Sequence, residues 1–216
     1  MKPAPPVTTA RMGRIVSTTM FVSFEGVDGS GKSTQAGLLA ASLRAAGHEV
    51  IETREPGGTP LGEQVRAMLL HGGDMTPWAE AALFAASRAQ HVEEVIRPAL
   101  ERGAWVVCDR YIDSSVVYQG VVRGLGAEAV YELNRVVTRD LLPHRTFLLD
   151  LDAAVSRARQ EGELDRIERE NDTFRAGVVD AYRELARRQP ERFVILDARA
   201  AAADLAQEIR EQLLDG

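Results

Sequence analysis

The chain has little cysteine, no long hydrophobic run and no excess of basic residues, and each absence excludes a class of protein. A single cysteine, Cys108, rules out an internal disulfide and a cysteine-based zinc cluster, and it fits a reducing compartment. No apolar stretch approaches the ~18 residues that a membrane span needs. The 216 residues carry 26 basic and 32 acidic side chains, too acidic a balance for a surface that coats nucleic acid. We expect no membrane or nucleic-acid partner and a cytoplasmic location.

The first residues differ in composition from the rest of the chain. Residues 1–19 contain three prolines, several hydroxyl side chains and a few basic residues, without the apolar centre of a secretory signal. We expect a disordered tail over residues 1–19. The remainder has the balance of apolar and charged residues that is typical of a globular domain, so a single domain is expected over residues 20–216.

Five short apolar segments alternate with longer helical ones. Each apolar segment is rich in β-branched or aromatic residues and is apolar on both faces, which is typical of buried parallel strands. Strands are expected over Met20–Phe24, Glu49–Ile51, Ala104–Cys108, Thr146–Leu149 and Phe193–Leu196. Helices are expected over Lys32–Ala46, Leu61–Leu70, Pro77–Arg102, Ala127–Arg139, Ala153–Arg159, Asp172–Gln189 and Ala200–Leu214. This alternation predicts an α/β fold, a doubly wound parallel sheet with helices on both faces and a ligand at the strand carboxyl ends.

The expected helix over Pro77–Arg102 is apolar nearly all round at its start, where residues 81–86 read Ala-Ala-Leu-Phe-Ala-Ala. Two interpretations remain open. The helix is either buried in the core of its own chain, or buried partly against a second subunit.

A glycine-rich loop gives the most specific signal in the sequence. Residues 26–33 fit the pattern G-x-x-x-x-G-K-[ST] between an expected strand and an expected helix. Its glycines let backbone N–H groups converge on phosphate oxygens, Lys32 supplies a charge toward the β- and γ-phosphates, and Ser33 offers a hydroxyl to Mg²⁺. The predicted ATP-binding residues are Gly26, Val27, Asp28, Gly29, Ser30, Gly31, Lys32, Ser33 and Thr34. The loop alone does not separate ATPases, GTP switches and small-molecule kinases, although no Asn-Lys-x-Asp motif for guanine is present.

Further clusters follow the other expected strands. Residues 53–59 read Thr-Arg-Glu-Pro-Gly-Gly-Thr, residues 109–111 read Asp-Arg-Tyr, and four arginines lie between residues 157 and 169. The carboxyl ends of parallel strands meet at one edge of the sheet, so these groups should lie beside the glycine-rich loop. Several arginines beside a triphosphate site indicate a second anionic substrate.

With these motifs the sequence resembles the thymidylate kinase family. The matching stretches are residues 24–34, 53–59, 109–120 and 162–168, and the resemblance extends from residue 20 to the end. It implies transfer of the γ-phosphoryl group of ATP to dTMP, giving dTDP and ADP, with Mg²⁺ as cofactor. It also implies a homodimer, a five-stranded parallel sheet and a short mobile lid, here at about residues 153–171.

The resemblance assigns roles around the acceptor phosphate. Asp109 follows four apolar strand residues, where a carboxylate would hold Mg²⁺ together with Ser33. Arg110 would grip the acceptor phosphate, with Arg54 as support. The Glu55-Pro56 pair resembles a cis-proline turn that shapes the acceptor pocket, and Asp28 would contact the sugar 3′-hydroxyl.

The resemblance also assigns roles around the base. Phe84 and Arg88 are four residues apart and share one helix face. Phe84 would stack on thymine and Arg88 would reach its O4. Tyr118 would pack against the deoxyribose, where a ribose 2′-hydroxyl would collide. Ser115 and Gln119 are expected to line the same pocket.

A catalytic arginine is expected in the lid, because residues 27–30 of the loop contain none. Arg159 is the first choice, because it lies nearest the expected hinge at Gly162; Arg166 comes second, and Arg157 is a further candidate. Glu161 stands where the commonest family pattern has another arginine, so the choice among the three stays open. Two other functions also stay open, a kinase for another nucleoside monophosphate such as dUMP or CMP, and a P-loop switch.

Overall fold

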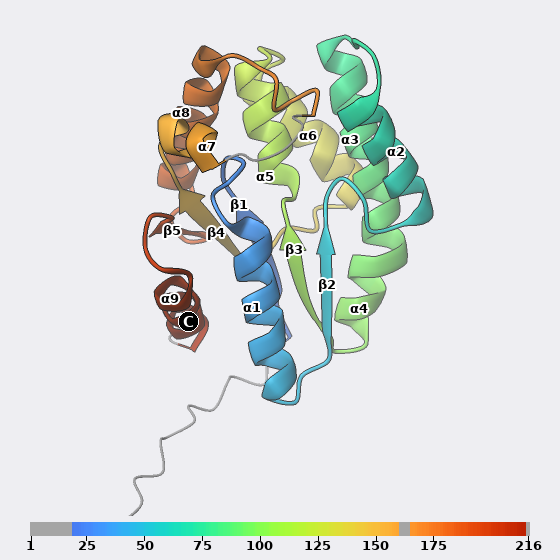
Figure 1. The fold of residues 1–216 in the computed structure, drawn as a ribbon. Coiled ribbons are helices and arrows are strands. Elements are labelled where there is room, and N and C mark those ends of the chain that lie inside the picture. The colour runs from blue at the N-terminus through green and yellow to red at the C-terminus, as the bar shows by residue number, and fades with distance from the viewer. Residues whose placement is uncertain (1–18, 160–164, 215–216) are drawn as a thin grey trace, which may run out of the picture.

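The structure, a computed structural model, describes residues 19–159 and 165–214 (Figure 1). The expected tail apart from Thr19, and the expected hinge at Gly162 with its neighbour Glu161, lie outside the described residues. Within the described ranges, no helix is long and apolar enough to cross a bilayer.

A five-stranded parallel sheet forms the centre of the fold. Its strands are β1 (Phe21–Glu25), β2 (Val50–Arg54), β3 (Trp105–Asp109), β4 (Arg145–Asp150) and β5 (Phe193–Asp197), in the order β2-β3-β1-β4-β5. The doubly wound prediction is therefore confirmed, and all five expected strands are present. Each strand continues past its predicted end to a charged residue, because backbone pairing does not stop where the apolar side chains stop. Five charged groups thus stand at the carboxyl edge.

Helices cover both faces of this sheet. They are α1 (Lys32–Ala45), α2 (Pro60–His71), α3 (Pro77–His91), α4 (Arg97–Glu101), α5 (Ile112–Ser115), α6 (Ala127–Thr138), α7 (Ala153–Arg159), α8 (Asp172–Arg188) and α9 (Ala202–Leu214), with π-helical turns at η1 (Val92–Ile96) and η2 (Val116–Val122). Figure 1 shows α1 crossing in front of the sheet, where one core cluster includes Val22 and Val107. The alternate strand residues Phe21 and Cys108 belong to a second cluster with η1 and α4. Burial on both faces explains why the central strands β1, β3 and β4 are largely apolar, whereas the edge strands β2 and β5 alternate between buried and more exposed residues.

One prediction about the helices needs correction, and one helical segment was missed. The segment over Pro77–Arg102 is helical, but it is divided by the π-helical turn η1, and the start of α3 is not buried all round, because Ala82 and Ala86 are exposed. The helical segment formed by α5 and η2 was not predicted. Its residues read Ile-Asp-Ser-Ser-Val-Val at the start, a run with low intrinsic helix propensity. Packing of η2 against α6 and α8 outweighs that preference.

Candidate active site

The glycine-rich loop joins β1 to α1 and forms the wall of a cavity of about 380 Å³. Gly26 has a φ of 138°, and a Cβ there would come within 2.6 Å of the Leu149 carbonyl oxygen, so the position requires glycine. Lys32 is buried, and its Nζ donates to the Val27 carbonyl 2.8 Å away. We call this space the donor cavity, because its loop is expected to bind the phosphoryl donor. It is lined by Asp28, Gly29, Gly31, Lys32, Ser33, Thr34, Arg54, Glu55, Arg66, Asp109, Arg110 and Glu168.

Ser33 and Asp109 meet in the donor cavity from different elements. Ser33 lies in the first turn of α1, Asp109 ends β3, and the Ser33 hydroxyl donates a hydrogen bond to Asp109 Oδ2. A hydroxyl and a carboxylate are oxygen ligands of the kind that Mg²⁺ takes beside substrate phosphates. This pair is the part of the described site that could hold the ion.

Arg110 stands between the donor cavity and a second cavity. Its φ of 69° is strained for a residue with a Cβ, and its N–H donates to the Phe24 carbonyl at 2.9 Å. The guanidinium donates to Asp28 Oδ1 at 2.5 Å and to Ser114 Oγ at 3.1 Å, and it lies over the Tyr118 ring. The unusual backbone therefore directs this side chain to the boundary of the two cavities.

The second cavity, called the acceptor cavity below, has a volume of about 160 Å³. It shares Asp28, Glu55, Arg66, Arg110 and Glu168 with the donor cavity, so the two adjoin. Of the residues predicted to bind dTMP, Asp28, Glu55, Pro56, Phe84, Arg110, Tyr118 and Gln119 line it. The Glu55-Pro56 peptide bond is cis. Sequence reasoning missed the other lining residues Arg66, Leu70, Ser114, Asp165, Ile167 and Glu168.

Arg54 and Arg66 extend the positive charge around this boundary. Arg54 lines the donor cavity and forms an exposed ion pair with Glu63 at 2.9 Å. Arg66 lines both cavities, and its Nη1 donates to the Pro56 carbonyl at 3.0 Å. An anion at the boundary would therefore meet three guanidinium groups.

Arg88 and Ser115 are not among the residues that line the acceptor cavity. Arg88 is 1 % exposed and spends four of its five N–H groups on Glu55, Ser115, Asn134 and the Tyr111 carbonyl. Among the described residues, the second N–H of Nη2 has no hydrogen-bond partner. The cluster holds the Glu55 carboxylate in place at the cavity wall.

His91 completes this buried cluster. Its Nδ1 lies 2.9 Å from Glu55 Oε1, and its Nε2 lies 2.7 Å from Thr53 Oγ1. Neither His91 nor Asn134 was predicted to take part in the site. Both are polar residues on the buried faces of their helices, α3 and α6, and a polar residue at an apolar position of the helical pattern is the signal that could have pointed to them.

Gln119 lines the acceptor cavity, and its side-chain amide has a hydrogen-bond partner for its nitrogen but none for its oxygen among the described residues. The residue is 1 % exposed, and its Nε2 donates to Glu80 Oε1 at 2.8 Å. Its Oε1 is buried without a hydrogen-bond partner among the described residues. A buried acceptor in a cavity wall is a point at which a donor on a ligand can bind.

Glu25 supports Arg110 from beneath and was not predicted to have a role. Its carboxylate accepts hydrogen bonds from the Tyr111 N–H at 2.7 Å, Ser114 Oγ at 2.6 Å and the Tyr182 hydroxyl at 2.8 Å. Burial and the nearby Asp113 charge raise the pKa of Glu25 to about 7. The carboxyl therefore titrates near neutral pH.

Charges in the donor cavity influence one another. Burial and the charge of Arg110 lower the pKa of Lys32 to about 8. Burial alone would raise the pKa of Asp28, but Arg110 and Lys32 outweigh it and hold that pKa below its usual value. Asp28 is therefore an anion at neutral pH, paired with the cations on either side.

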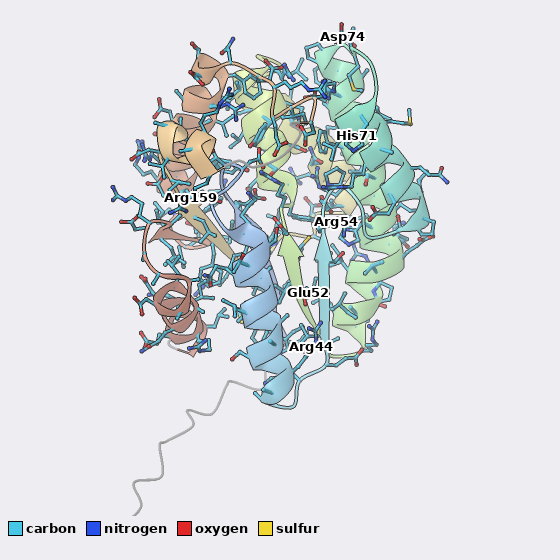
Figure 2. The ribbon with its side chains drawn as sticks, viewed as in Figure 1. Arg44, Glu52, Arg54, His71, Asp74 and Arg159 are labelled. Carbon is cyan, nitrogen blue, oxygen red and sulfur yellow. The ribbon has the colours of Figure 1, made fainter. Side chains whose placement is uncertain are left out.

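The three candidate lid arginines are placed differently, and none is among the described residues that line either cavity. Arg157 is exposed. Arg159 lies against the loop: a Cβ placed on Gly29 would be 3.2 Å from the Cβ of Arg159. The Nη1 of Arg159 donates a hydrogen bond to the Ala198 carbonyl at 3.0 Å. Figure 2 shows Arg159 and Arg54 on opposite sides of α1. Arg166 donates to Glu80 Oε2 at 2.7 Å and to the Leu69 carbonyl at 2.8 Å.

A phosphate-binding loop, a hydroxyl–carboxylate pair and an adjoining arginine-lined cavity on a five-stranded parallel sheet define a P-loop kinase with separate donor and acceptor cavities. The family model for thymidylate kinase matches residues 24–209. The chain belongs to the thymidylate kinase family.

Relatives of similar length support this membership. The chain is 52 % identical over 184 residues to a thymidylate kinase of Bifidobacterium longum (strain NCC 2705), covering 83 % of this chain and 89 % of that one. It is 48 % identical over 197 residues to one of Deinococcus radiodurans, covering 90 % and 96 %. The crystal structure of thymidylate kinase from Ehrlichia chaffeensis superposes with a TM-score of 0.74 at 33 % identity, covering 91 % of this chain and 99 % of that one.

Proposed function

We propose that this protein transfers the γ-phosphoryl group of ATP to dTMP, giving dTDP and ADP. The single observation that carries the proposal is the pair of adjoining cavities with Arg110 at their boundary. A switch that binds one nucleotide has no need of the second cavity. Membership in the thymidylate kinase family favours dTMP over dUMP or CMP as the acceptor.

The donor cavity supports binding of the ATP phosphates. Backbone N–H groups of residues 26–34, the positive end of α1 and the Lys32 ammonium meet the β- and γ-phosphates. Ser33 and Asp109 would hold Mg²⁺, which when bound neutralises phosphate charge and orients the donor. Asp109, placed at the end of β3, keeps the Ser33 hydroxyl aimed into the cavity.

The acceptor cavity supports binding of a pyrimidine deoxynucleotide. Its phosphate lies at the boundary, where Arg110, Arg66 and Arg54 meet it, and the Asp28 carboxylate accepts a hydrogen bond from the 3′-hydroxyl. Phe84 stacks on the ring. Gln119 Oε1 accepts from N3–H, and Tyr118 packs against C2′. Arg88 donates to O4 in this proposal, which requires its side chain to reach beyond the present cavity wall, because Arg88 does not line the cavity in this structure.

Catalysis in this arrangement is positioning and charge neutralisation, because phosphoryl transfer needs little covalent help. Arg110 aligns the attacking phosphate oxygen with the γ-phosphorus. The charge that develops on the equatorial oxygens needs a further cation, which Arg159 supplies from α7 when the lid residues 153–171 close over ATP. Its position against Gly29 supports this choice.

A homodimer and a cytoplasmic location belong to the same proposal. Trp78, Ala82 and Ala86 are exposed and, being four residues apart in α3, share one face of the helix. A second subunit packed on this face would bury it. The molecular mass in solution, measured by light scattering, tests the dimer, and Trp78→Ala or Trp78→Asp should weaken it.

The experiment that tests the activity is ADP formation from ATP and Mg²⁺ with dTMP, dUMP, CMP or no acceptor. Among these acceptors we expect only dTMP to give rapid ADP formation from ATP. An excess of chelator should abolish this ADP formation. The same rate without an acceptor would identify an ATPase or a switch. A preference for dUMP or CMP would identify a different nucleoside monophosphate kinase.

A further inference from the structure

Glu80, in the first turn of α3, is a buried carboxylate that joins three separate parts of the chain. It is 2 % exposed although it stands between two alanines at the start of a helix. Its oxygens accept hydrogen bonds from Gln119 Nε2 at 2.8 Å, Arg166 Nη2 at 2.7 Å, and Arg123 Nε and Nη2, each at 3.3 Å. No role has been given to Glu80 so far, yet it contacts Gln119 in the wall of the acceptor cavity.

The contact with Glu80 determines which end of the Gln119 amide faces which way. An amide has a donor end and an acceptor end of almost equal size, and either could in principle point to the cavity. Burial by itself would raise the pKa of Glu80, but hydrogen bonds from Gln119 and Arg166 outweigh it and hold that pKa below its usual value. An ionised carboxylate only accepts, so it takes the NH₂ end.

The oxygen of Gln119 is consequently left without a partner in a residue that lines the acceptor cavity. Gln119 lines this cavity, and Oε1 is buried with no hydrogen-bond partner in the described part of the chain. Rotating the amide by half a turn would set its carbonyl against the Glu80 carboxylate, oxygen against oxygen. The Glu80 contact therefore makes the cavity wall a fixed acceptor rather than an adaptable group.

We propose that Glu80 is a positioning residue that sets base selectivity by fixing the Gln119 amide with its oxygen toward the acceptor cavity. This inference rests on the proposed function. Thymine and uracil carry a hydrogen on N3 and can donate to that oxygen. The N3 of cytosine is an acceptor and meets it lone pair to lone pair. Arg123 and Arg166 keep Glu80 charged, so they act on the base through two intermediate contacts.

The test compares two nucleotides of nearly equal shape in Glu80→Gln. A glutamine at position 80 can donate as well as accept, so it permits either orientation of the Gln119 amide. The substrates are dTMP and 5-methyl-dCMP, which differ only at N3 and at the group on C4. We expect the ratio of kcat/KM values, dTMP over 5-methyl-dCMP, to fall at least ~10-fold from wild type. A loss of packing alone would lower both values together and leave the ratio unchanged.

Three further variants isolate the route through Gln119. Gln119→Leu removes the amide while leaving Glu80 and its arginines intact, and it should reduce the ratio as Glu80→Gln does. The double variant should show no further reduction, because both changes remove the same contact. Asp113→Asn is the matched control: Asp113 is a buried carboxylate paired with Arg192, lines neither cavity, and its variant should keep the wild-type ratio.

Each result assigns its cause. An unchanged ratio in folded Glu80→Gln overturns the proposal, and so does a ratio in the double variant that falls well below that of Gln119→Leu. If Glu80→Gln does not fold, the ratio in Gln119→Leu decides, and an unchanged ratio there is equally contrary. If the wild-type protein does not phosphorylate dTMP, the proposed function fails. The ratio of dissociation constants for the two nucleotides, measured by calorimetry in wild type and Glu80→Gln, then tests Glu80 independently of turnover.

Discussion

Tyr182 donates its hydroxyl proton to Glu25 Oε2 across 2.8 Å, although 157 positions separate the two residues in the chain. Both are fully buried, and Ser114 contacts both of them as well as Arg110. The acceptor arginine is thus supported by a small polar cluster with a carboxylate at its centre. The protonation of that carboxylate affects both stability and the site.

We predict that stability falls with rising pH because of Glu25. Its pKa is raised to about 7 in the fold, above the ordinary value of 4.5, so the folded state holds the proton more tightly than the unfolded state. This contribution is fully present below about pH 4.5 and is lost as the pH rises through 7. Relative to Glu25→Gln, the free energy of unfolding of the wild type should fall by up to ~3 kcal/mol across that range. Urea titrations of both proteins at several pH values measure it, and parallel curves would contradict it.

We predict that Lys32→Ala loses turnover while keeping its fold. The ammonium is the cation that meets the β- and γ-phosphates, and removal of one preorganised group of this kind costs at least ~10²-fold in kcat. Thermal unfolding should shift little, since burial of Lys32 is itself unfavourable to its charge. The matched control is Arg44→Ala on the same helix, which removes an exposed pair with Glu52 far from the loop (Figure 2). Full activity in Lys32→Ala would contradict the donor assignment.

We predict that Tyr118→Ala relaxes the exclusion of ribonucleotides. The Tyr118 ring is 8 % exposed and is held by Arg110, Phe174 and Tyr182 around it. Its removal opens space beside C2′ of the acceptor sugar. The ratio of kcat/KM for dTMP over ribo-TMP should drop at least ~10-fold, as expected when a steric contact of a few kcal/mol is removed. Tyr118→Phe, which keeps the ring, should retain the wild-type ratio. An unchanged ratio in the alanine variant would mean that the ring only packs.

We predict that the three lid arginines separate by kinetic parameter. Arg159→Ala should lower kcat at least ~10-fold with little change in KM for dTMP, the pattern of a contact made in the transition state. Arg166 pairs with Glu80 behind the acceptor cavity, so Arg166→Ala should chiefly raise KM for dTMP. Arg157 and Arg159 are both exposed, but Arg159 lies against Gly29 of the loop, so Arg157→Ala is the control with wild-type values. Wild-type kcat in all three would show that catalysis needs no lid arginine.

The strands and the phosphate loop could be predicted because their signals are local. Four strands are apolar runs and β2 begins with the apolar pair Val50-Ile51, while the loop is a spacing of glycines with Lys32 that is typical of a phosphate-binding loop. The helix over residues 112–122 could not be predicted, because its Ile, Val, Ser and Asp residues disfavour a helix and only packing against α6 and α8 stabilises it.

The buried contacts behind the cavity wall could not be predicted from the sequence for a different reason. Glu80 and Gln119 are 39 positions apart, and nothing in their spacing indicates that they meet. The resemblance gave Arg88 a role at the base, but not the buried contacts with Glu55 and Asn134 that occupy it. The sequence signal for these buried polar clusters is a charged residue within an alanine-rich helix, as for Glu80 and Arg88 in α3.

The strand order also predicts that the backbone opens at different rates in different parts of the site. β1 lies at the centre between β3 and β4, whereas β2 and β5 are the edges of the sheet. Amide hydrogens on β1 and β3 should exchange with deuterated solvent only when the whole domain opens, while those on β2 exchange through smaller fluctuations. The glycine-rich loop and Arg110 therefore directly follow β1 and β3, the strands whose amide hydrogens should exchange most slowly. Arg54, at the end of an edge strand, can therefore lose and re-form its contacts without opening β1 or β3.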